Sequence, residues 1–354
     1  MSAINSTNQR QSICQVVRPI ALTMGDPAGI GPEIIVKALA QFPALLSQVC
    51  VVGDLGVMQR AQSRCGVALP MVGHDPKTAA LDNLSEGVLH VVQTSVLDPL
   101  PAFGVVQADA GLAAAHAIEW AAKAALRGRV GAVVTAPIHK EALHAAGYSY
   151  PGHTEMLQAL AAEHLGLSSE QVPVRMMLSN HELRTVLVSI HISLRQAIEA
   201  VTQDNVLSAL KAAQAHAQQA GWPRCRMAVA GLNPHAGEGG LMGVEERDII
   251  EPAVLQAQKE GLDVQGPFAP DTIFMRARRG EFDVVIAMYH DQGLIPVKYM
   301  GLSEGVNTTL GLPFVRTSPD HGTAFDIAGT GQADPASLLE AIRQTPMGQR
   351  LARN

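Results

Sequence analysis

The sequence lacks the short motifs that usually identify a nucleotide site, a sulfur-bound metal or a redox pair. Its 354 residues contain no G-x-G-x-x-G dinucleotide fingerprint, no G-x-x-x-x-G-K-[ST] phosphate loop and no C-x-x-C or C-x-x-H spacing. The wide separation of the cysteines fits a reducing compartment and argues against a zinc site with sulfur ligands. These cysteines are Cys14, Cys50, Cys65 and Cys225.

Charge and long apolar runs are also scarce. Charged residues make up only 16% of the chain, the net charge is −6, and no cluster of Lys and Arg is present. Nucleic acid and anionic membrane surfaces are therefore poor candidates for the main partner. No apolar run can span a bilayer, and the polar first residues do not resemble a secretory signal. We expect a cytoplasmic protein with a flexible N-terminal extension at residues 1–17.

What the sequence does contain is an alternation of strand-like and helical patterns. The run "RPIALTM" precedes the helical "GPEIIVKALAQF", and "GLAAAHAIEWAAKAALRG" precedes the strand-like "VGAVVTAP". This repetition predicts an α/β fold with a largely parallel sheet, helices on both faces and ligands at the carboxyl ends of strands. We expect two domains, with residues 18–146 and 318–354 in the first and residues 147–317 in the second.

Three of the 13 histidines directly follow apolar strand-like runs: His191, His235 and His290. If their strands end at one edge of the sheet, three imidazoles could bind a divalent ion such as Zn²⁺ and leave positions open for substrate. Their wide spacing matches no short zinc motif, so structural roles remain open. Asp271 or Asp291 could accept a hydrogen bond from such a ligand.

Other residues indicate an anionic ligand. The turn in "GDPAGIGPEI" predicts exposed backbone N–H groups, although its two carboxylates disfavour a pyrophosphate. The cations Lys298 and Arg316, with His153 and Thr154 of "PGHTEM", can bind phosphate or carboxylate. Each cation alone could be a solvated surface charge, but together they favour an anionic substrate.

Taken in order, these segments resemble the 4-hydroxythreonine-4-phosphate dehydrogenase family of pyridoxal phosphate biosynthesis. The resemblance rests on "GDPAGIGPEI", "TAPIHKEAL", "YPGHTEM", "IHISLRQAI", "GLNPHAGEGG", "APDTIF", "AMYHDQGL" and "VNTTLGLPFVRTSPDHGTAFDIAG". It implies a two-domain, three-layer α/β/α fold like that of isocitrate and isopropylmalate dehydrogenases, with the active site in the cleft between the domains. Proteins of that fold bind NAD without the usual fingerprint.

The resemblance also implies roles for individual residues. The metal ligands would be His191, His235 and His290. The substrate contacts would be His153, Thr154, Lys298, Asn307 and Arg316. The family forms a homodimer in which the partner subunit donates the first of the three histidines. Its cofactors are NAD, with NADP as an alternative, and a divalent metal, with Zn²⁺ expected before Mg²⁺ or Co²⁺. No residue is implied for the nicotinamide cofactor. Two departures are Ser193, where proline is frequent, and His139, where asparagine is frequent.

The implied reaction is the NAD-dependent oxidation of 4-phosphohydroxy-L-threonine at C3. The resulting β-keto acid decarboxylates to 3-amino-2-oxopropyl phosphate. Asp271, Asp291 or a metal-bound hydroxide could be the base that takes the hydroxyl proton. Related enzymes oxidise threonate or erythronate 4-phosphate or cyclic diol carboxylates, and the phosphate contacts favour an acyclic substrate. A metal-dependent lyase or hydrolase without nicotinamide, and a non-catalytic binding protein, are the alternatives from other classes.

Overall fold

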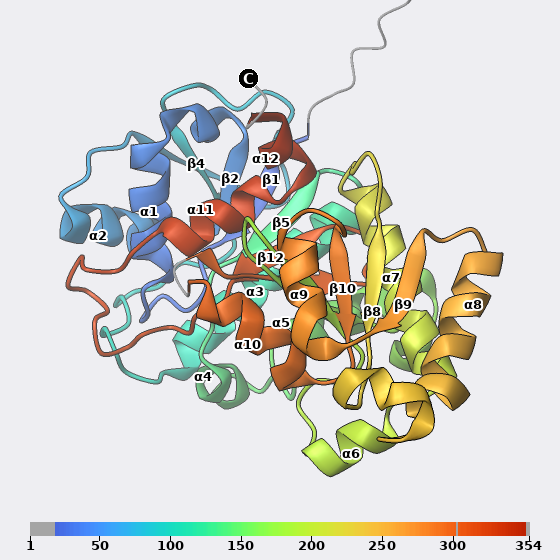
Figure 1. Cartoon of the computed structure of the whole chain (residues 1–354). Helices are drawn as coiled ribbons and strands as arrows, with labels where there is room; N and C mark the ends of the chain where they lie inside the picture. The colour runs from blue at the N-terminus through green and yellow to red at the C-terminus, as the bar shows by residue number, and fades with distance from the viewer. Residues whose placement is uncertain (1–17, 302–303, 352–354) are drawn as a thin grey trace, which may run out of the picture.

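A single twelve-stranded sheet runs through both halves of the protein. The computed structural model describes residues 18–301 and 304–351, so the predicted flexible extension at residues 1–17 lies outside the described residues. The strand order is β3-β4-β2-β1-β5-β12-β11-β6-β7-β10-β8-β9. Figure 1 shows the first strands in blue and green on one side, and β8, β9 and β10 in yellow and orange on the other.

The sheet consists of two parallel blocks that run in opposite directions. The first block contains β1 (Ile20–Thr23), β2 (Val49–Gly53), β3 (Met71–His74), β4 (Leu89–Gln93), β5 (Ala132–Thr135) and β12 (Arg316–Pro319). The second block contains β7 (Arg184–Leu187), β8 (Met227–Ala230), β9 (Val264–Phe268) and β10 (Val284–Ala287). Between them lie β11 (Val306–Leu310) and β6 (Arg175–Ser179), whose pairings are antiparallel.

Twelve α-helices lie among the described residues. They are α1 (Gly31–Gln41), α2 (Leu55–Cys65), α3 (Ala108–Leu126), α4 (Lys140–Ala145), α5 (His153–Leu165), α6 (Leu194–Glu199), α7 (Gln203–Gln219), α8 (Glu251–Lys259), α9 (Pro270–Arg278), α10 (His290–Tyr299), α11 (Ala336–Arg343) and α12 (Pro346–Leu351). None of these helices has both the length and the apolar character needed to cross a membrane.

Helices cover both faces of each block, as the alternation of buried side chains shows. In β1, Leu22 packs in one apolar cluster with α1 and α11, whereas Ala21 packs in another with α3 and α5. In β10, Ile286 and Val285 divide in the same way between a cluster with α7 and α8 and a cluster with α9. Successive strand residues face opposite sides, so both faces are buried. The predicted three-layer α/β/α fold is confirmed.

The division into two domains stays a prediction, because the sheet continues between the blocks. Helix α5 belongs by number to the predicted second domain, yet its Met156 and Leu157 pack in the core of the first block. Helix α11, near the other end of the chain, packs on the same block through Leu338 and Ile342.

Local sequence signals account for the helix ends. Helix α7 begins after Thr202, whose side chain accepts a hydrogen bond from the backbone N–H of Asn205. Helix α2 begins after Asp54, whose carboxylate accepts from the N–H of Val57, and ends at Gly66 in the left-handed conformation.

The close packing of α3 against α4 can be tested by substitution at Gly111. A Cβ atom on Gly111 of α3 would lie 2.0 Å from the carbonyl oxygen of Ala142 and 2.8 Å from the nitrogen of Leu143. These are backbone atoms, which cannot move without moving α4. We expect Gly111→Ala to lower the free energy of unfolding by about 1–3 kcal/mol, measured by urea denaturation. Leu112→Ala, at a 38% exposed position, should cost less. Equal stability of Gly111→Ala and wild type would contradict this packing.

Candidate substrate pocket and metal site

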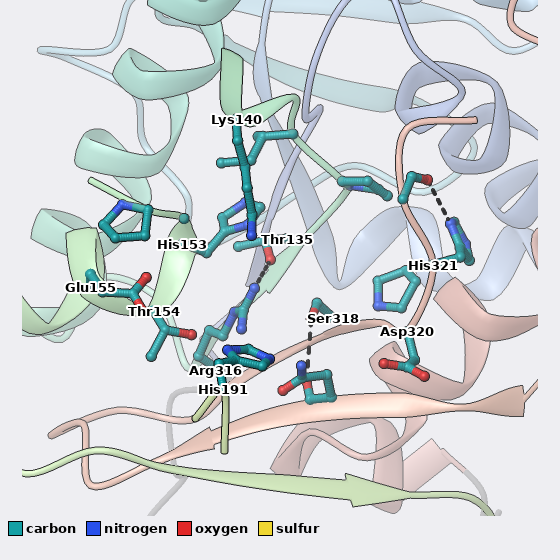
Figure 2. Close-up of a pocket in the computed structure, with 17 residues that line it drawn as sticks. Thr135, Lys140, His153, Thr154, Glu155, His191, Arg316, Ser318, Asp320 and His321 are labelled. Carbon is teal, nitrogen blue, oxygen red and sulfur yellow. Dashed lines mark hydrogen bonds between the residues drawn. The ribbon is translucent and has the colours of Figure 1, made fainter. Parts of the chain in front are cut away.

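A pocket of about 390 Å³ collects side chains from distant parts of the chain. Four of the five predicted substrate contacts line it: His153, Thr154, Asn307 and Arg316. Its other polar or charged lining residues are Thr135, Lys140, Glu155, His191, Ser318, Asp320 and His321. Figure 2 shows these side chains around one space, with the guanidinium of Arg316 directed to Thr135.

Arg316 lies in the wall of this pocket without a carboxylate partner at hydrogen-bond distance. It is only 3% exposed, and its guanidinium donates to the hydroxyls of Thr309 (2.9 Å) and Thr135 (2.6 Å), while Nε has no partner. Burial lowers its pKa from 12.5 to about 10, and the charge of Glu155 acts in the opposite sense. The group therefore stays cationic near neutral pH. A buried cation bonded to neutral hydroxyls favours an anionic ligand.

The first turn of α5 forms another part of the pocket wall. His153 and Thr154 follow Gly152 at the positive end of the helix, a position that suits an anion. His153 Nε2 is buried without a hydrogen-bond partner. Burial, and then the charge of Arg316, hold the pKa of His153 well below its usual 6.5. The imidazole is therefore neutral near pH 7.

Lys298 is the predicted contact that does not line the pocket. It lies in the last turn of α10 and forms an ion pair with Asp320 at 3.0 Å. Asp320 does line the pocket, so Lys298 compensates a charge in the wall. The lysine that does line the pocket is Lys140, which was not among the candidates named from the sequence. The sequence does place Lys140 shortly after a strand-like run, whose strand ends at Thr135. This is the same position, after a strand, that pointed to the three histidines.

The "GDPAGIGPEI" turn does not expose its backbone to a ligand, and the prediction that it does is wrong. Its residues are buried. The N–H of Asp26 donates to Pro137 (2.9 Å) and that of Ile30 to Thr323 (3.0 Å). A Cβ atom on Gly25, at φ 73°, would lie 2.4 Å from the carbonyl oxygen of Pro137. The glycines therefore allow close packing against the loop that follows β5.

The three predicted metal ligands follow strands that are neighbours in the sheet. Strands β7, β10 and β8 are adjacent and parallel, so their carboxyl ends, which precede His191, His290 and His235, meet at one edge. The rings of His191 and His290 lie 5.8 Å apart between centroids and line a cavity of about 280 Å³. His235 does not join them. Within residues 18–301 and 304–351, no three His, Cys, Asp or Glu side chains of one chain are arranged to hold a metal.

The carboxylates beside two of these histidines nevertheless fit a metal site. His290 Nδ1 lies 2.7 Å from Asp291 Oδ1, and His235 Nδ1 lies 3.2 Å from Glu238 Oε2. A carboxylate at Nδ1 is the usual partner of a metal-binding imidazole, because it orients the ring and leaves Nε2 for the ion. The donor set of neutral nitrogens suits Zn²⁺ or Co²⁺ better than Mg²⁺.

The two predicted bases lie in different surroundings. Asp291 lines the cavity between His191 and His290, and its carboxylate contacts His290. Asp271 lies exposed in the first turn of α9 and does not line either of these two cavities. The structure tests neither as a base, and both assignments stay predictions.

Comparison with known proteins identifies the family. The family model described as "Pyridoxal phosphate biosynthetic protein PdxA" matches residues 46–345. The chain belongs to this family. The resemblance seen in the sequence is thereby confirmed. Among its PdxA relatives, a 4-hydroxythreonine-4-phosphate dehydrogenase of Beijerinckia indica is 54% identical, over 92% of this chain and 93% of that protein. A D-threonate 4-phosphate dehydrogenase of Salmonella typhimurium is 44% identical, over 92% and 97%.

Solved structures of two similar dehydrogenases have the same fold. The crystal structure of a 4-hydroxythreonine-4-phosphate dehydrogenase from Klebsiella pneumoniae aligns with a TM-score of 0.82 at 43% identity, covering 94% of this chain and 98% of that one. A terephthalate 1,2-cis-dihydrodiol dehydrogenase from Burkholderia xenovorans aligns with a TM-score of 0.66 at 34% identity, covering 94% and 98%. Dehydrogenases of this fold therefore act on more than one class of hydroxylated substrate.

The depressed pKa of His153 predicts a dependence of stability on pH. Because the folded pKa lies below the unfolded one, the unfolded chain binds more protons below about pH 6.5, and stability falls as pH decreases through that value. We expect this decline to be shallower in His153→Gln than in wild type, measured as the free energy of unfolding between pH 8 and pH 5. His164→Gln, at an exposed position on the same helix, should retain the wild-type decline. Identical slopes for His153→Gln and wild type would refute a buried neutral imidazole.

Proposed function

We propose that this protein is a cytoplasmic, NAD-dependent and divalent-metal-dependent 4-hydroxythreonine-4-phosphate dehydrogenase. It oxidises 4-phosphohydroxy-L-threonine at C3 to a β-keto acid, which decarboxylates to 3-amino-2-oxopropyl phosphate on the route to pyridoxal phosphate. One observation carries the proposal: His153, Thr154, Asn307 and Arg316 line a single pocket. The name and 54% identity of the Beijerinckia relative support the choice of substrate.

The substrate phosphate binds between the first turn of α5 and Arg316. Lys140 and Arg316 supply positive charge, Thr154 supplies a hydroxyl, and the neutral His153 can donate one further hydrogen bond. The guanidinium of Arg316 is already oriented by two threonine hydroxyls, so it needs little rearrangement when the anion binds. These residues hold the substrate in place for reaction at C3.

His235 and His290, together with the His191 of a second copy of the chain, would hold the divalent ion. Asp291 can orient the His290 ring by accepting from its Nδ1, and the carboxylate of Glu238 lies 3.2 Å from Nδ1 of His235. When bound, the ion supplies Lewis acidity that lowers the pKa of the substrate hydroxyl, and the nicotinamide supplies the acceptor for a hydride. Asp271 and Asp291 remain the proposed bases. The contact of Asp291 with His290 favours an orienting role for Asp291.

Two buried polar atoms beside the pocket fit a polar group of the nicotinamide cofactor. Asp26 Oδ2 and His139 Nδ1 are buried without hydrogen-bond partners, and the charges of the two side chains interact. His139 lies between Ile138 and Lys140, which both line the pocket. An amide or ribose hydroxyl could satisfy both atoms. We therefore propose Asp26 and His139 as contacts of NAD or NADP.

Exposed apolar side chains near the histidines support a homodimer that shares the site. Close to His191, Leu194 of α6 is 61% exposed, and close to His235, Leu241 is 85% exposed. Leu194 also lines one cavity with Ile192, which is 46% exposed, and apolar side chains exposed together are typical of protein interfaces. A second copy of the chain would cover them and could bring its own His191 to the His235 and His290 of its partner.

The alternative substrate is D-threonate 4-phosphate, on which several relatives are named to act. It carries a hydroxyl in place of the C2 ammonium. The pocket contains the carboxylates of Glu155 and Asp320, and Glu155 has no ion-pair partner at 4 Å or less within the described part of the chain. A carboxylate in an anion pocket favours a substrate that also carries a positive charge.

A spectrophotometric assay tests the function. NADH should form when the protein is mixed with divalent metal, NAD⁺ and 4-phosphohydroxythreonine. The kcat/KM should exceed that for D-threonate 4-phosphate by about tenfold, or about 1.4 kcal/mol, because of the C2 ammonium. His290→Ala serves as an inactive control. A reversed preference would assign the protein to threonate 4-phosphate. Absence of NADH with every phosphorylated hydroxy acid would refute a dehydrogenase and favour a lyase.

The role of Lys140 predicts a separate kinetic effect. Loss of its ammonium removes a charge that binds the phosphate in ground state and transition state alike. We expect Lys140→Ala to raise KM about tenfold or more with a smaller change in kcat. Lys123→Ala provides the matched control, since Lys123 forms an exposed pair with Glu119 on α3. An unchanged KM in Lys140→Ala would exclude Lys140 as a phosphate contact.

A further inference from the structure

Glu246 is a buried carboxylate that lies under the turn carrying His235. It is 5% exposed and begins the helical turn Glu246–Ile250. Its Oε1 accepts from the backbone N–H groups of Leu232 and Asn233, both at 2.7 Å, and its Oε2 accepts from the side-chain amide of Asn233 at 2.9 Å. Acidic residues are favourable at a helix N-terminus, where Glu246 lies. The buried side chain of Glu246, however, accepts hydrogen bonds from the loop at Leu232 and Asn233.

The turn above Glu246 has an unusual backbone. Six consecutive residues, 235–240, have positive φ, and three of them are not glycine: His235 (53°), Ala236 (53°) and Glu238 (44°). Residues with a Cβ rarely adopt this conformation, and it persists only where surrounding contacts impose it. Charge-assisted hydrogen bonds from Leu232 and Asn233 to Glu246 are such contacts, because they hold the chain that leads into the turn.

Two glycines make room for the carboxylate. A Cβ atom on Gly231 would lie 3.0 Å from Glu246 Oε1, and one on Gly237 would lie 2.8 Å from Oε2. The glycines around His235 therefore admit Glu246 on the inner side of the turn. The outer side, which carries the exposed imidazole of His235, is left open.

Gln292 connects this turn to the strand that carries His290. Its Nε2 donates to the carbonyl of Gly231 at 2.7 Å, directly after β8, and its Oε1 accepts from the N–H of Met288 at 2.7 Å, directly after β10. One side-chain amide thus bridges the carboxyl ends of two adjacent strands. Gln292 itself lies two residues after His290 in the first turn of α10.

We propose that Glu246 and Gln292 are positioning residues of the metal site. The carboxylate of Glu246 holds the turn that presents His235, and the amide of Gln292 sets the separation between the strand ends that present His235 and His290. Neither side chain contacts the ion. This inference rests on the proposed function, because it requires that the two histidines bind one metal.

The experiment measures metal binding by the intact full-length protein without substrate. Metal-free wild type, Glu246→Gln and Gln292→Met are titrated with Zn²⁺ against a chromophoric chelator, and the visible spectrum of each Co²⁺ complex is recorded. Glu246→Gln places an amide N–H against the amide of Asn233, and Gln292→Met removes both bridging hydrogen bonds at similar volume. We expect each variant to bind Zn²⁺ about 10- to 100-fold more weakly and to change the Co²⁺ spectrum.

Glu251→Gln is the matched control, because Glu251 is exposed at the start of α8. It should keep the wild-type affinity and spectrum. Thermal unfolding of the metal-free proteins separates positioning from general stability. A variant that is less stable but binds Zn²⁺ with wild-type affinity and spectrum overturns the inference. If Glu246→Gln does not fold, the Zn²⁺ titration of Gln292→Met alone tests the inference, and wild-type affinity in that variant overturns it. Failure of wild type to bind any divalent metal would overturn the proposed metal dependence together with this inference.

Discussion

The reversal of strand direction at β11 and β6 is the constraint on which the site depends. Because three consecutive pairings are antiparallel, the block that contains β7, β10 and β8 runs opposite to the block that contains β5 and β12. Strands of the second block therefore end at the edge where β12 begins. Arg316 is the first residue of β12, and His191 and His290 follow the ends of β7 and β10. This geometry explains why Arg316 and His191 line the same pocket, although one begins a strand and the other follows one.

The charged side chains around this pocket determine which ligands it favours. In a protein with few charged residues, Arg316 is buried against threonine hydroxyls, and no carboxylate neutralises it at close range. The carboxylate of Asp320 is instead paired with Lys298, outside the lining. The pocket thus keeps positive charge available for a ligand, while Glu155 adds a negative group beside it. Such an arrangement suits a phosphorylated substrate that also carries an amine.

Much of the fold was predictable because its signals are local. The helical pattern of "GPEIIVKALAQF" corresponds to α1, and that of "GLAAAHAIEWAAKAALRG" covers most of α3 and the turn that follows it. The predicted substrate contacts at His153, Thr154, Asn307 and Arg316 also share one pocket. The prediction that was wrong concerns packing, because the glycine-rich turn at Gly25 packs against the loop after β5. The role of Lys298 as a substrate contact stays a prediction, and this residue lies on a helix beside Asp320. Neither outcome depends on nearby sequence.

The sequence by itself determined which residue types stand at the ends of strands, because hydrophobic periodicity and turn residues act over a few positions. It thereby placed His191, His235 and His290 after strands, and the order of its longer motifs carried the resemblance to the family to which the chain belongs. Only the tertiary structure decided which strand ends are neighbours, which lysine lines the pocket, and that Glu246 and Gln292 connect the turns that carry two of the histidines. These features depend on strand order and on contacts between residues far apart in the chain, and no local pattern records them.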